Sequence, residues 1–466
     1  MGYKGAVSGV RMTAWMMLWT GLAQATPVAL VGATVHPVDG PPLEDAVVLV
    51  EDGLIQAVGS RSEVVVPGDA VVQALEGRHI TPGLIDLHSH IGGGRLHESL
   101  GQVQAGISAV DAIDPTHVSI ARAQAGGITT VNIMPGSGKL LGGQTAYLSL
   151  RDGVVVDDLL LCRDPDSQLW TPASSHDAAS PEAPPARHRL ICGGVKMANG
   201  TNPQGQGGDP RSRMGSAWLQ RKALLEAKAV SDALAAADAY AAASWWERRK
   251  LSDTERPKPD LAGRVMVQVV RGERAVHFHS HRADDMVTAL RLREEVGPQL
   301  DLVLHHGSEG FKVADVVADA GVPVAINVLD TPGGKEETLE RRLSNPAELA
   351  EKGVTVAIIT DDPVQDSRLL YRSAGLAVRG GLSPEDALRA LTLTPAELLG
   401  MADQTGSLTV GKEADLVVLS GPPLSVWSLV EQTWVDGEVV YDRADPAQRR
   451  VAEGGDAAVD PAVGGP

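Results

Sequence analysis

The stretch Thr81-Pro-Gly-Leu-Ile-Asp-Leu-His-Ser-His90 decides the fold prediction, because it joins an apolar run to two histidines. Residues 80–87 are typical of a strand buried on both faces of a parallel sheet. Residues i and i+2 of a strand face the same side, so His88 and His90 are expected to point inward together from the carboxyl end of this strand. Such a pair suits a metal ion, although a His-x-His pattern also occurs as ordinary packed or surface histidines.

Seven similar runs follow along the chain, separated by helical or loop segments. Eight runs within about 280 residues predict an α/β protein with a (β/α)₈ barrel, a fold of about 250 residues that carries its active site at the carboxyl ends of the strands. A long Ala-rich helix is expected over residues 214–251. The further strand runs comprise residues 128–134, 146–150, 190–197, 275–278, 302–304, 322–328 and 354–359.

Both ends of the chain have a different pattern from the middle. Residues 27–66 and 406–440 contain short Val-rich runs broken by turn residues, which is typical of small antiparallel strands. The two ends are therefore expected to pair into one small β domain. Its two parts are predicted at residues 26–79 and 401–442, with the barrel between them at 80–400. The glycine-rich residues 443–466 are expected to form a disordered tail.

The first residues have the pattern of a targeting segment. Lys4 and Arg11 precede an apolar run over residues 12–22, and Ala23-Gln-Ala25 offers small residues at a cleavage site. We therefore expect a signal peptide over residues 1–25, cleaved after Ala25, and an exported, periplasmic protein with no membrane partner in its mature form. An uncleaved anchor is the alternative, but the run has about half of the roughly 20 apolar residues that a spanning helix needs.

The charge balance limits the classes of partner. The 466 residues include 41 Lys and Arg against 59 Asp and Glu, a formal net charge of −18. This charge repels phosphate backbones, so the expected partner is a small-molecule substrate and not a nucleic acid. The sequence leaves the oligomeric state open, with a homo-oligomer as one alternative.

The two cysteines, Cys162 and Cys192, bracket a Pro-rich stretch that is expected to be an irregular surface insertion. In an oxidising compartment a disulfide between them would close this loop, with a stabilisation on the order of 3 kcal/mol. Two buried thiols are an equally good interpretation. Neither cysteine is part of a thiolate metal cluster, because two are too few.

Histidines gather at the ends of three predicted strands. Neutral imidazoles combined with a carboxylate favour zinc, and catalytic zinc keeps one position open for water. The grouped residues are seven of the 13 histidines of the chain, namely His88 and His90, then His277, His279 and His281, and finally His305 and His306.

Further ligand types follow in order, as Lys196 and Asp361 also stand at predicted strand ends. At this point the sequence resembles the amidohydrolase superfamily, in its imidazolonepropionase-like and prolidase-like branch, over roughly residues 26–440. The most specific motifs are Pro82-Gly-Leu-Ile-Asp-Leu-His-Ser-His90, Met134-Pro-Gly-Ser-Gly138 with Gly142-Gly-Gln144, Val195-Lys-Met-Ala-Asn-Gly-Thr-Asn-Pro203, His279-Ser-His-Arg-Ala-Asp-Asp285, His306-Gly-Ser-Glu-Gly310 and Thr360-Asp-Asp-Pro363.

The resemblance implies a distorted TIM barrel flanked by a β-sandwich built from both chain ends. It also implies one or two divalent ions, with two zinc ions favoured. His88 and His90 would bind the more buried ion together with Asp361, and His279 and His306 would bind the more exposed one. Lys196 would be carboxylated and bridge the two ions, since a carbamate is an anionic oxygen ligand where an ammonium would be repelled. An ordinary salt-bridging or substrate-binding lysine is the alternative.

The remaining site residues require a choice. The resemblance favours Asp361 over Asp362 as general base, and adjacent strand residues face opposite sides. His281 is expected to contact or support the substrate, while His277 and His305 are expected to be structural. Arg213 and Arg282 could clamp a substrate carboxylate, since guanidinium groups match carboxylates, although most arginines are simply solvated.

The expected function is a metal-dependent hydrolase that cleaves a C–N bond, as in an amide, cyclic amide or dipeptide, by means of a metal-activated hydroxide. One alternative is a mononuclear enzyme of the imidazolonepropionase or deaminase type. Those relatives resemble one another in a Glu three residues after the fifth-strand histidine, and here Arg282 stands at that distance from His279. A ligand-binding barrel without catalysis is the alternative from another class.

Overall fold

The computed structural model describes residues 26–161, 193–204, 209–251, 255–328 and 334–454. The expected signal peptide over residues 1–25 and both cysteines, Cys162 and Cys192, lie outside the described residues. The described part is a mixed α/β fold of three sheets, which agrees with the predicted class. Among its helices, none is both long and apolar enough to cross a membrane.

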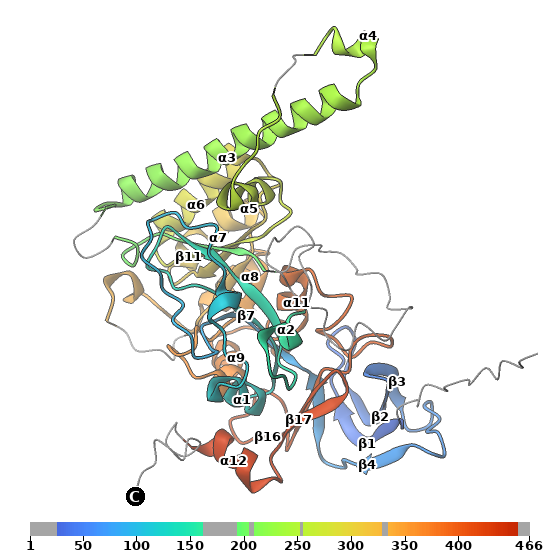
Figure 1. Ribbon diagram of the computed structural model, residues 1–466. Coiled ribbons are helices and arrows are strands. Elements are labelled where there is room, and N and C mark those ends of the chain that lie inside the picture. Colours follow the sequence, from blue (N-terminus) through green and yellow to red (C-terminus); the bar gives the residue numbers. More distant parts are fainter. Residues whose placement is uncertain (1–25, 162–192, 205–208, 252–254, 329–333, 455–466) are drawn as a thin grey trace, which may run out of the picture.

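Strands from both ends of the chain form one eight-stranded sheet, as the Val-rich runs predicted. Its core includes Leu30 and Ile80 from the first part and Leu416 and Trp434 from the last. The sheet lies to one side of the molecule (Figure 1). Its order is β17-β16-β15-β5-β1-β2-β3, with β4 also paired to β1. The strands are β1 (Val28–Val35), β2 (Leu43–Glu51), β3 (Leu54–Ser60), β4 (Val71–Ala74), β5 (His79–Pro82), β15 (Leu416–Leu419), β16 (Val430–Val435) and β17 (Glu438–Asp442).

The predicted single strand over residues 80–87 is wrong, because the chain divides this run between two sheets. β5 ends at Pro82 in the end sheet, and β6 (Leu84–Ser89) begins in a sheet with β7 (Ile128–Ile133) and β9 (Ala146–Ser149). Gly83 stands at the division, where a Cβ atom would lie 2.1 Å from the Oγ1 atom of Thr129. Only glycine therefore lets the backbone pass so close to β7.

The third sheet contains most of the other predicted strands. Its order is β14-β13-β12-β11-β10-β8, and all its pairs are parallel except that of β10 with β8. The strand β8 was not predicted, and β9 pairs antiparallel with β7, so the third predicted run is not a parallel strand. The strands are β8 (Leu141–Gln144), β10 (Val195–Ala198), β11 (Val276–Ser280), β12 (Leu302–His306), β13 (Val324–Ile326) and β14 (Val356–Ile358).

The two smaller sheets meet at the carboxyl ends of β6 and β14. An isolated parallel bridge joins Ser89 to Asp362 there, and the backbone N–H of His90 donates to the carbonyl of Asp362 at 2.9 Å. The strand ends that carry the predicted ligands are thereby brought side by side. A closed barrel remains a prediction.

Helices cover the sheets, and the longest of them projects away from the body of the molecule (Figure 1). It is α3, whose first residue follows Ser212, an N-cap whose hydroxyl accepts from the backbone N–H of Gly215. The expectation of a disordered tail from residue 443 is wrong for the described part, which contains α12. The helices are α1 (Val118–Ala125), α2 (Val156–Leu159), α3 (Arg213–Ala242), α4 (Trp245–Arg248), α5 (Leu261–Val270), α6 (Ala283–Val296), α7 (Ala314–Asp319), α8 (Asn345–Glu351), α9 (Leu370–Arg379), α10 (Pro384–Arg389), α11 (Leu393–Leu399) and α12 (Pro446–Glu453).

Candidate metal centre and active site

The end of β6 and the segment after β14 bring two histidines to one carboxylate. The Nε2 atoms of His88 and His90 lie 3.3 and 3.0 Å from the Oδ1 atom of Asp361. Asp361 has a left-handed backbone with φ of 60°, a strained conformation for a residue with a side chain. Asp362, the rival candidate, instead accepts from the backbone N–H and hydroxyl of Ser367 at 2.8 and 2.7 Å. The structure thus brings Asp361, and not Asp362, to the histidines.

The contacts of His90 direct its Nε2 atom at the carboxylate of Asp361. Its Nδ1 atom lies 2.7 Å from the carbonyl oxygen of Met134, which can only accept, so Nδ1 carries a hydrogen. In a neutral ring, the Nε2 atom then presents a lone pair to an anionic oxygen only 3.0 Å away. Two acceptors at this distance repel each other unless a proton or a metal ion lies between them.

His306, the last residue of β12, is held as a ligand from the other side. Its Nδ1 atom lies 2.5 Å from the Oδ1 atom of Asn327, whose amide nitrogen donates to the carbonyl of Thr360 at 2.8 Å and so fixes the amide orientation. The hydrogen of His306 is therefore on Nδ1. Its Nε2 atom is buried and has no hydrogen-bond partner among the described residues, so its lone pair is available to a metal ion.

Two groups of ligand atoms meet at His306. One contains His88, His306 and Asp361, and the other contains His279, His281 and His306. Within each group the ligand atoms lie within 4.8 Å of one another. His281 therefore joins the second group beside the two histidines predicted for it, and its ring stacks on that of His306 with centroids 4.7 Å apart.

The register of β11 and β12 determines which of their residues lie opposite one another. His279 lies opposite His305, and Ser280 lies opposite His306. His277 and His305 contact each other, with Nδ1 and Nε2 atoms 3.0 Å apart. Burial is the largest cause that holds the pKa values of His279 and His306 well below the ordinary value. Neutral imidazole is the form that binds metal ions.

Lys196, on β10, is fully buried beside the first group. Its Nζ atom donates to the Nε2 atom of His88 at 3.0 Å and lies 2.9 Å from the Sδ atom of Met134. Burial lowers the pKa of Lys196 to about 7, while the charge of Asp361 acts in the opposite direction. A large fraction of this side chain is therefore a neutral amine near neutral pH.

The two arginines predicted to bind substrate are brought together at α6. The guanidinium of Arg213 pairs with Asp284 at 2.6 Å and with Asp285 at 2.7 Å, and that of Arg282 pairs with Asp284 at 3.1 Å. Both arginines thus contact carboxylates of the protein itself. Their role in binding substrate stays a prediction.

Sequence reasoning missed several residues that position this site. Asp86 is fully buried, and it accepts from the backbone N–H groups of His88 and Thr360 at 3.2 Å each and from the hydroxyl of Thr360. Burial raises the pKa of Asp86 to about 7. Its place two residues before His88 was the available signal. Asn327 stands near the carboxyl end of the predicted strand run 322–328, and this position was its only signal.

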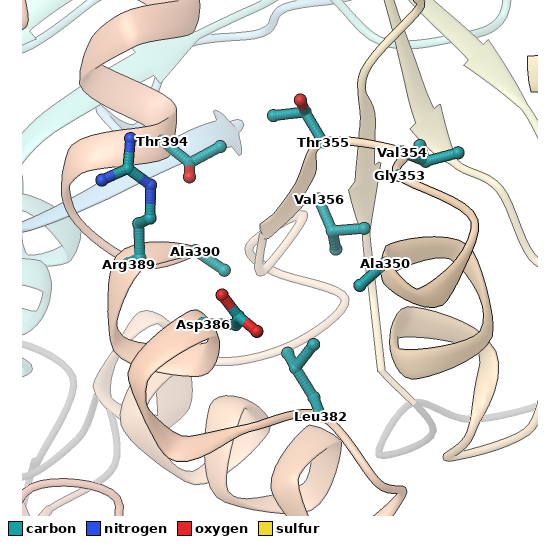
Figure 2. A pocket seen from close by; sticks show the side chains of 10 residues that line it. All are labelled: Ala350, Gly353, Val354, Thr355, Val356, Leu382, Asp386, Arg389, Ala390 and Thr394. Carbon is teal, nitrogen blue, oxygen red and sulfur yellow. The ribbon is translucent and has the colours of Figure 1, made fainter. Parts of the chain in front are cut away.

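A pocket of about 230 Å³ lies at the opposite end of β14 (Figure 2). Val354 and Thr355, which precede the strand, line it together with Asp386 and Arg389 of α10. The pocket is therefore separated from the histidines by the length of the strand. It lies at the amino end of β14, the end opposite the predicted ligands.

Comparisons with known proteins agree with this architecture. The model of the amidohydrolase family matches residues 334–440. The solved structure of an amidohydrolase from Thermotoga maritima MSB8 is 32% identical, with a TM-score of 0.72, over 89% of this chain and 100% of that one. A putative prolidase from Bifidobacterium longum has the same fold at 18% identity, with a TM-score of 0.52 over 92% of this chain and 98% of that one.

Two curated relatives also span most of the chain. "Amidohydrolase tasK" of Hapsidospora irregularis is 27% identical over 85% of the chain, which spans only 40% of the length of that relative. An imidazolonepropionase of Streptococcus pyogenes is 22% identical, over 88% of this chain and 94% of that protein. The chain therefore belongs to the amidohydrolase family, as its motifs predicted.

Proposed function

We propose that the protein is a metal-dependent hydrolase that cleaves an amide, cyclic amide or dipeptide-like C–N bond. Two divalent ions, with zinc favoured, would be held by His88, His90, Lys196, His279, His306 and Asp361. The observation that carries the proposal is the approach of the Nε2 atom of His90 to the Oδ1 atom of Asp361 at 3.0 Å, a contact between two ligand atoms that a shared metal ion would stabilise. The buried Nε2 atom of His306, which has no hydrogen-bond partner among the described residues, also fits a metal ligand.

Different residues of the site would have different roles in hydrolysis. Divalent ions bound there would supply positive charge that acidifies water and polarises the carbonyl of the substrate. Asp361 would accept a proton from the attacking water and return it to the leaving nitrogen, which its contact with both His88 and His90 places it to do. His281, next to His279 and His306, would contact the substrate or complete the second ligand group.

Lys196 would carry the bridging carbamate. The neutral amine attacks CO₂, so an N–C bond forms and one proton is released, which leaves an anionic group with two oxygens. The low pKa of this buried lysine, about 7, favours the reactive neutral form. An ordinary salt-bridging or substrate-binding lysine is the alternative.

The wider architecture belongs to the same proposal. The sheets that contain β6 and β14 would close into a distorted TIM barrel, supported by the bridge between Ser89 and Asp362. The end sheet would fold into a β-sandwich beside it. The sequence pattern of residues 1–25 supports export to the periplasm, and Arg213 and Arg282 remain candidates for binding the substrate.

Metal content is the measurement that tests the proposal. Elemental analysis of the purified protein and of a Lys196→Ala variant should give about two ions per chain, falling to one or none in the variant. One ion in both proteins would favour the mononuclear alternative. An absence of bound metal in the wild-type protein, together with no hydrolysis of acylated amino acids, dipeptides or cyclic amides, would favour a binding protein without catalysis.

A further inference from the structure

The loop that carries Asp361 extends from the end of β14 to the short 3₁₀ helix η4 (Ser367–Leu369). Within it, the backbone N–H of Val364 donates to the carbonyl of Asp361 at 2.7 Å. The left-handed backbone of Asp361, with φ of 60°, persists only where the surrounding structure holds it. The contacts that hold the far end of this loop therefore bear on the position of Asp361.

The far end of this loop packs against α1. Gly126 directly follows α1, and a Cβ atom there would lie 2.8 Å from the Cα atom of Arg368 and 2.9 Å from the carbonyl oxygen of Ser367. Only glycine therefore allows the two segments to come so close. The carboxylate of Asp366 accepts from Arg122 of α1, and from the Nη2 atom of Arg368 at 2.6 Å. The end of the loop is thus fixed to α1 by packing and by ion pairs.

Arg368 also joins the loop to α12. Its Nη1 atom donates to the backbone carbonyls of Val451 at 2.8 Å, Ala452 at 3.1 Å and Gly454 at 2.7 Å. The last carbonyls of a helix have no partner within the helix, and this end of a helix carries a partial negative charge. The mostly buried guanidinium of Arg368 therefore supplies both the donors and the positive charge that the end of α12 needs.

The other end of α12 is anchored to the end sheet. The N-cap residue Asp445 accepts from the backbone N–H of Ala447 at 2.7 Å. The side chain of Gln448 accepts from the backbone N–H of Asp442, the last residue of β17, at 2.5 Å. α12 also packs beside α1. The helix therefore connects the end sheet to the loop that carries Asp361.

We infer that α12, acting through Arg368, positions Asp361 at the histidines. Arg368 is a positioning residue, because it holds the loop in the conformation that Asp361 needs in order to bind an ion and to accept a proton. The inference rests on the proposed function, which assigns these two roles to Asp361. It gives a role in the chemistry to a helix that lies where the sequence predicted a disordered tail.

Two matched pairs of full-length variants test this role. Arg368→Met removes the donors to α12, and Arg379→Met makes the same substitution at the exposed end of α9. Arg450→Pro interrupts α12, because proline removes a helical N–H group and clashes with the preceding turn. Arg450→Ala is its control, since alanine at this exposed position keeps the helix.

Hydrogen exchange of the metal-free protein measures how often the loop opens. The backbone amide of Val364 should exchange about tenfold faster in Arg368→Met and in Arg450→Pro than in the wild-type protein. Both control variants should exchange at the wild-type rate. Arg368→Lys should lie between, because it restores the charge without the planar donors. Equal rates in Arg368→Met and Arg379→Met would overturn the inference.

Zinc affinity, measured by competition with a chelator, tests the consequence for Asp361. It should fall about 3- to 10-fold in Arg368→Met and in Arg450→Pro, less than the roughly 10- to 100-fold that loss of a direct partner of a ligand costs. The two controls should keep the wild-type affinity, and Arg368→Lys should recover part of the loss. An unchanged affinity despite faster exchange would overturn the inference, because the loop would then not position Asp361.

These two measurements separate failure of the inference from failure of the proposed function. If the wild-type protein binds no zinc, the proposed function fails, and hydrogen exchange alone decides the inference. Faster exchange at Val364 in Arg368→Met and Arg450→Pro, with both controls at the wild-type rate, then supports it, and equal rates overturn it. If zinc binds and all variants exchange at the wild-type rate, the proposed function stands and the inference fails.

Discussion

Asp361 and Asp362 are neighbours in the chain with different partners, and this difference can be measured. Asp361→Asn should lower hydrolysis about 10²- to 10⁴-fold, because the amide cannot accept the proton that the carboxylate takes. Asp362→Asn should cost about 1 kcal/mol of stability, since Asp362 accepts two hydrogen bonds from Ser367, and should leave the metal content unchanged. Assays of rate, metal content and urea unfolding on both variants give the comparison. Loss of activity in Asp362→Asn alone would contradict the assignment.

Asn327 fixes the ring of His306, so its removal should weaken metal binding. In Asn327→Leu the Nδ1–H group of His306 has no amide oxygen to hold it, and the metal affinity should fall about 10- to 100-fold. Competition with a chelator measures this affinity. Asn199→Leu is the control, because that buried amide donates to the backbone carbonyl of Asp285 instead of holding a histidine. Equal affinities in the two variants would show that Asn327 does not position the ligand.

At the scale of single residues, the sequence predicted the candidate site residues that stand in motifs. His88, His90, His306 and Asp361 were predicted from their order at strand ends, and the structure brings them together. Asn327 and Arg368 could not be found in this way, because neither stands in a quoted motif. Each is a lone polar residue whose value depends on a neighbour that only the folded chain supplies.

At the scale of elements, a buried row of polar side chains that contact one another links the strands β9, β11 and β12. The hydroxyl of Tyr147 lies 3.0 Å from the Nε2 atom of His277, whose Nδ1 atom lies 3.0 Å from the Nε2 atom of His305. Tyr147→Phe removes one buried hydrogen bond and should lower the free energy of unfolding by about 1 to 3 kcal/mol. Urea unfolding measures the change. Tyr240→Phe is the control, because Tyr240 on α3 is half-buried. This substitution should change the free energy of unfolding by less than about 0.5 kcal/mol.

The element predictions failed where pairing partners lie far away in the chain. Residues 80–87 have one continuous pattern, yet β5 pairs with β15 while β6 pairs with β7. Likewise, β8 is the four-residue segment Leu-Gly-Gly-Gln, whose glycines have little strand propensity, and it forms because β10 lies beside it. The local sequence pattern predicted where strands and helices occur better than it predicted which strands pair with one another.

At the scale of the whole molecule, acidic residues lie where the end sheet meets the rest of the chain. The carboxylates of Glu413, Asp415 and Asp436 lie within 4.8 Å of one another, and Arg151 pairs with Asp436 at 3.0 Å. Burial is the main cause that raises the pKa of Asp415 to about 7 from its ordinary 3.8, and the charge of Asp436 adds to it.

The free energy of unfolding should therefore fall as Asp415 loses its proton. The folded state binds the proton more tightly than the unfolded state, so the contribution of Asp415 is complete below about pH 4 and is lost as the pH rises through 7. Relative to wild type, Asp415→Asn should gain on the order of 2 kcal/mol of unfolding free energy between pH 5 and pH 8. Urea unfolding at both values measures this gain. The exposed Asp69→Asn is the control, and an equal gain there would contradict the prediction.

The position of β15 between β5 and β16 has a consequence during synthesis. The ribosome makes β5 more than three hundred residues before β15, a delay of tens of seconds at roughly 5 to 20 residues per second. Throughout this interval β5 exposes an unpaired edge next to the apolar strand β6. We therefore expect nascent chains arrested before Leu416 to recruit chaperones or aggregate, and chains extended past Asp442 to become resistant to protease.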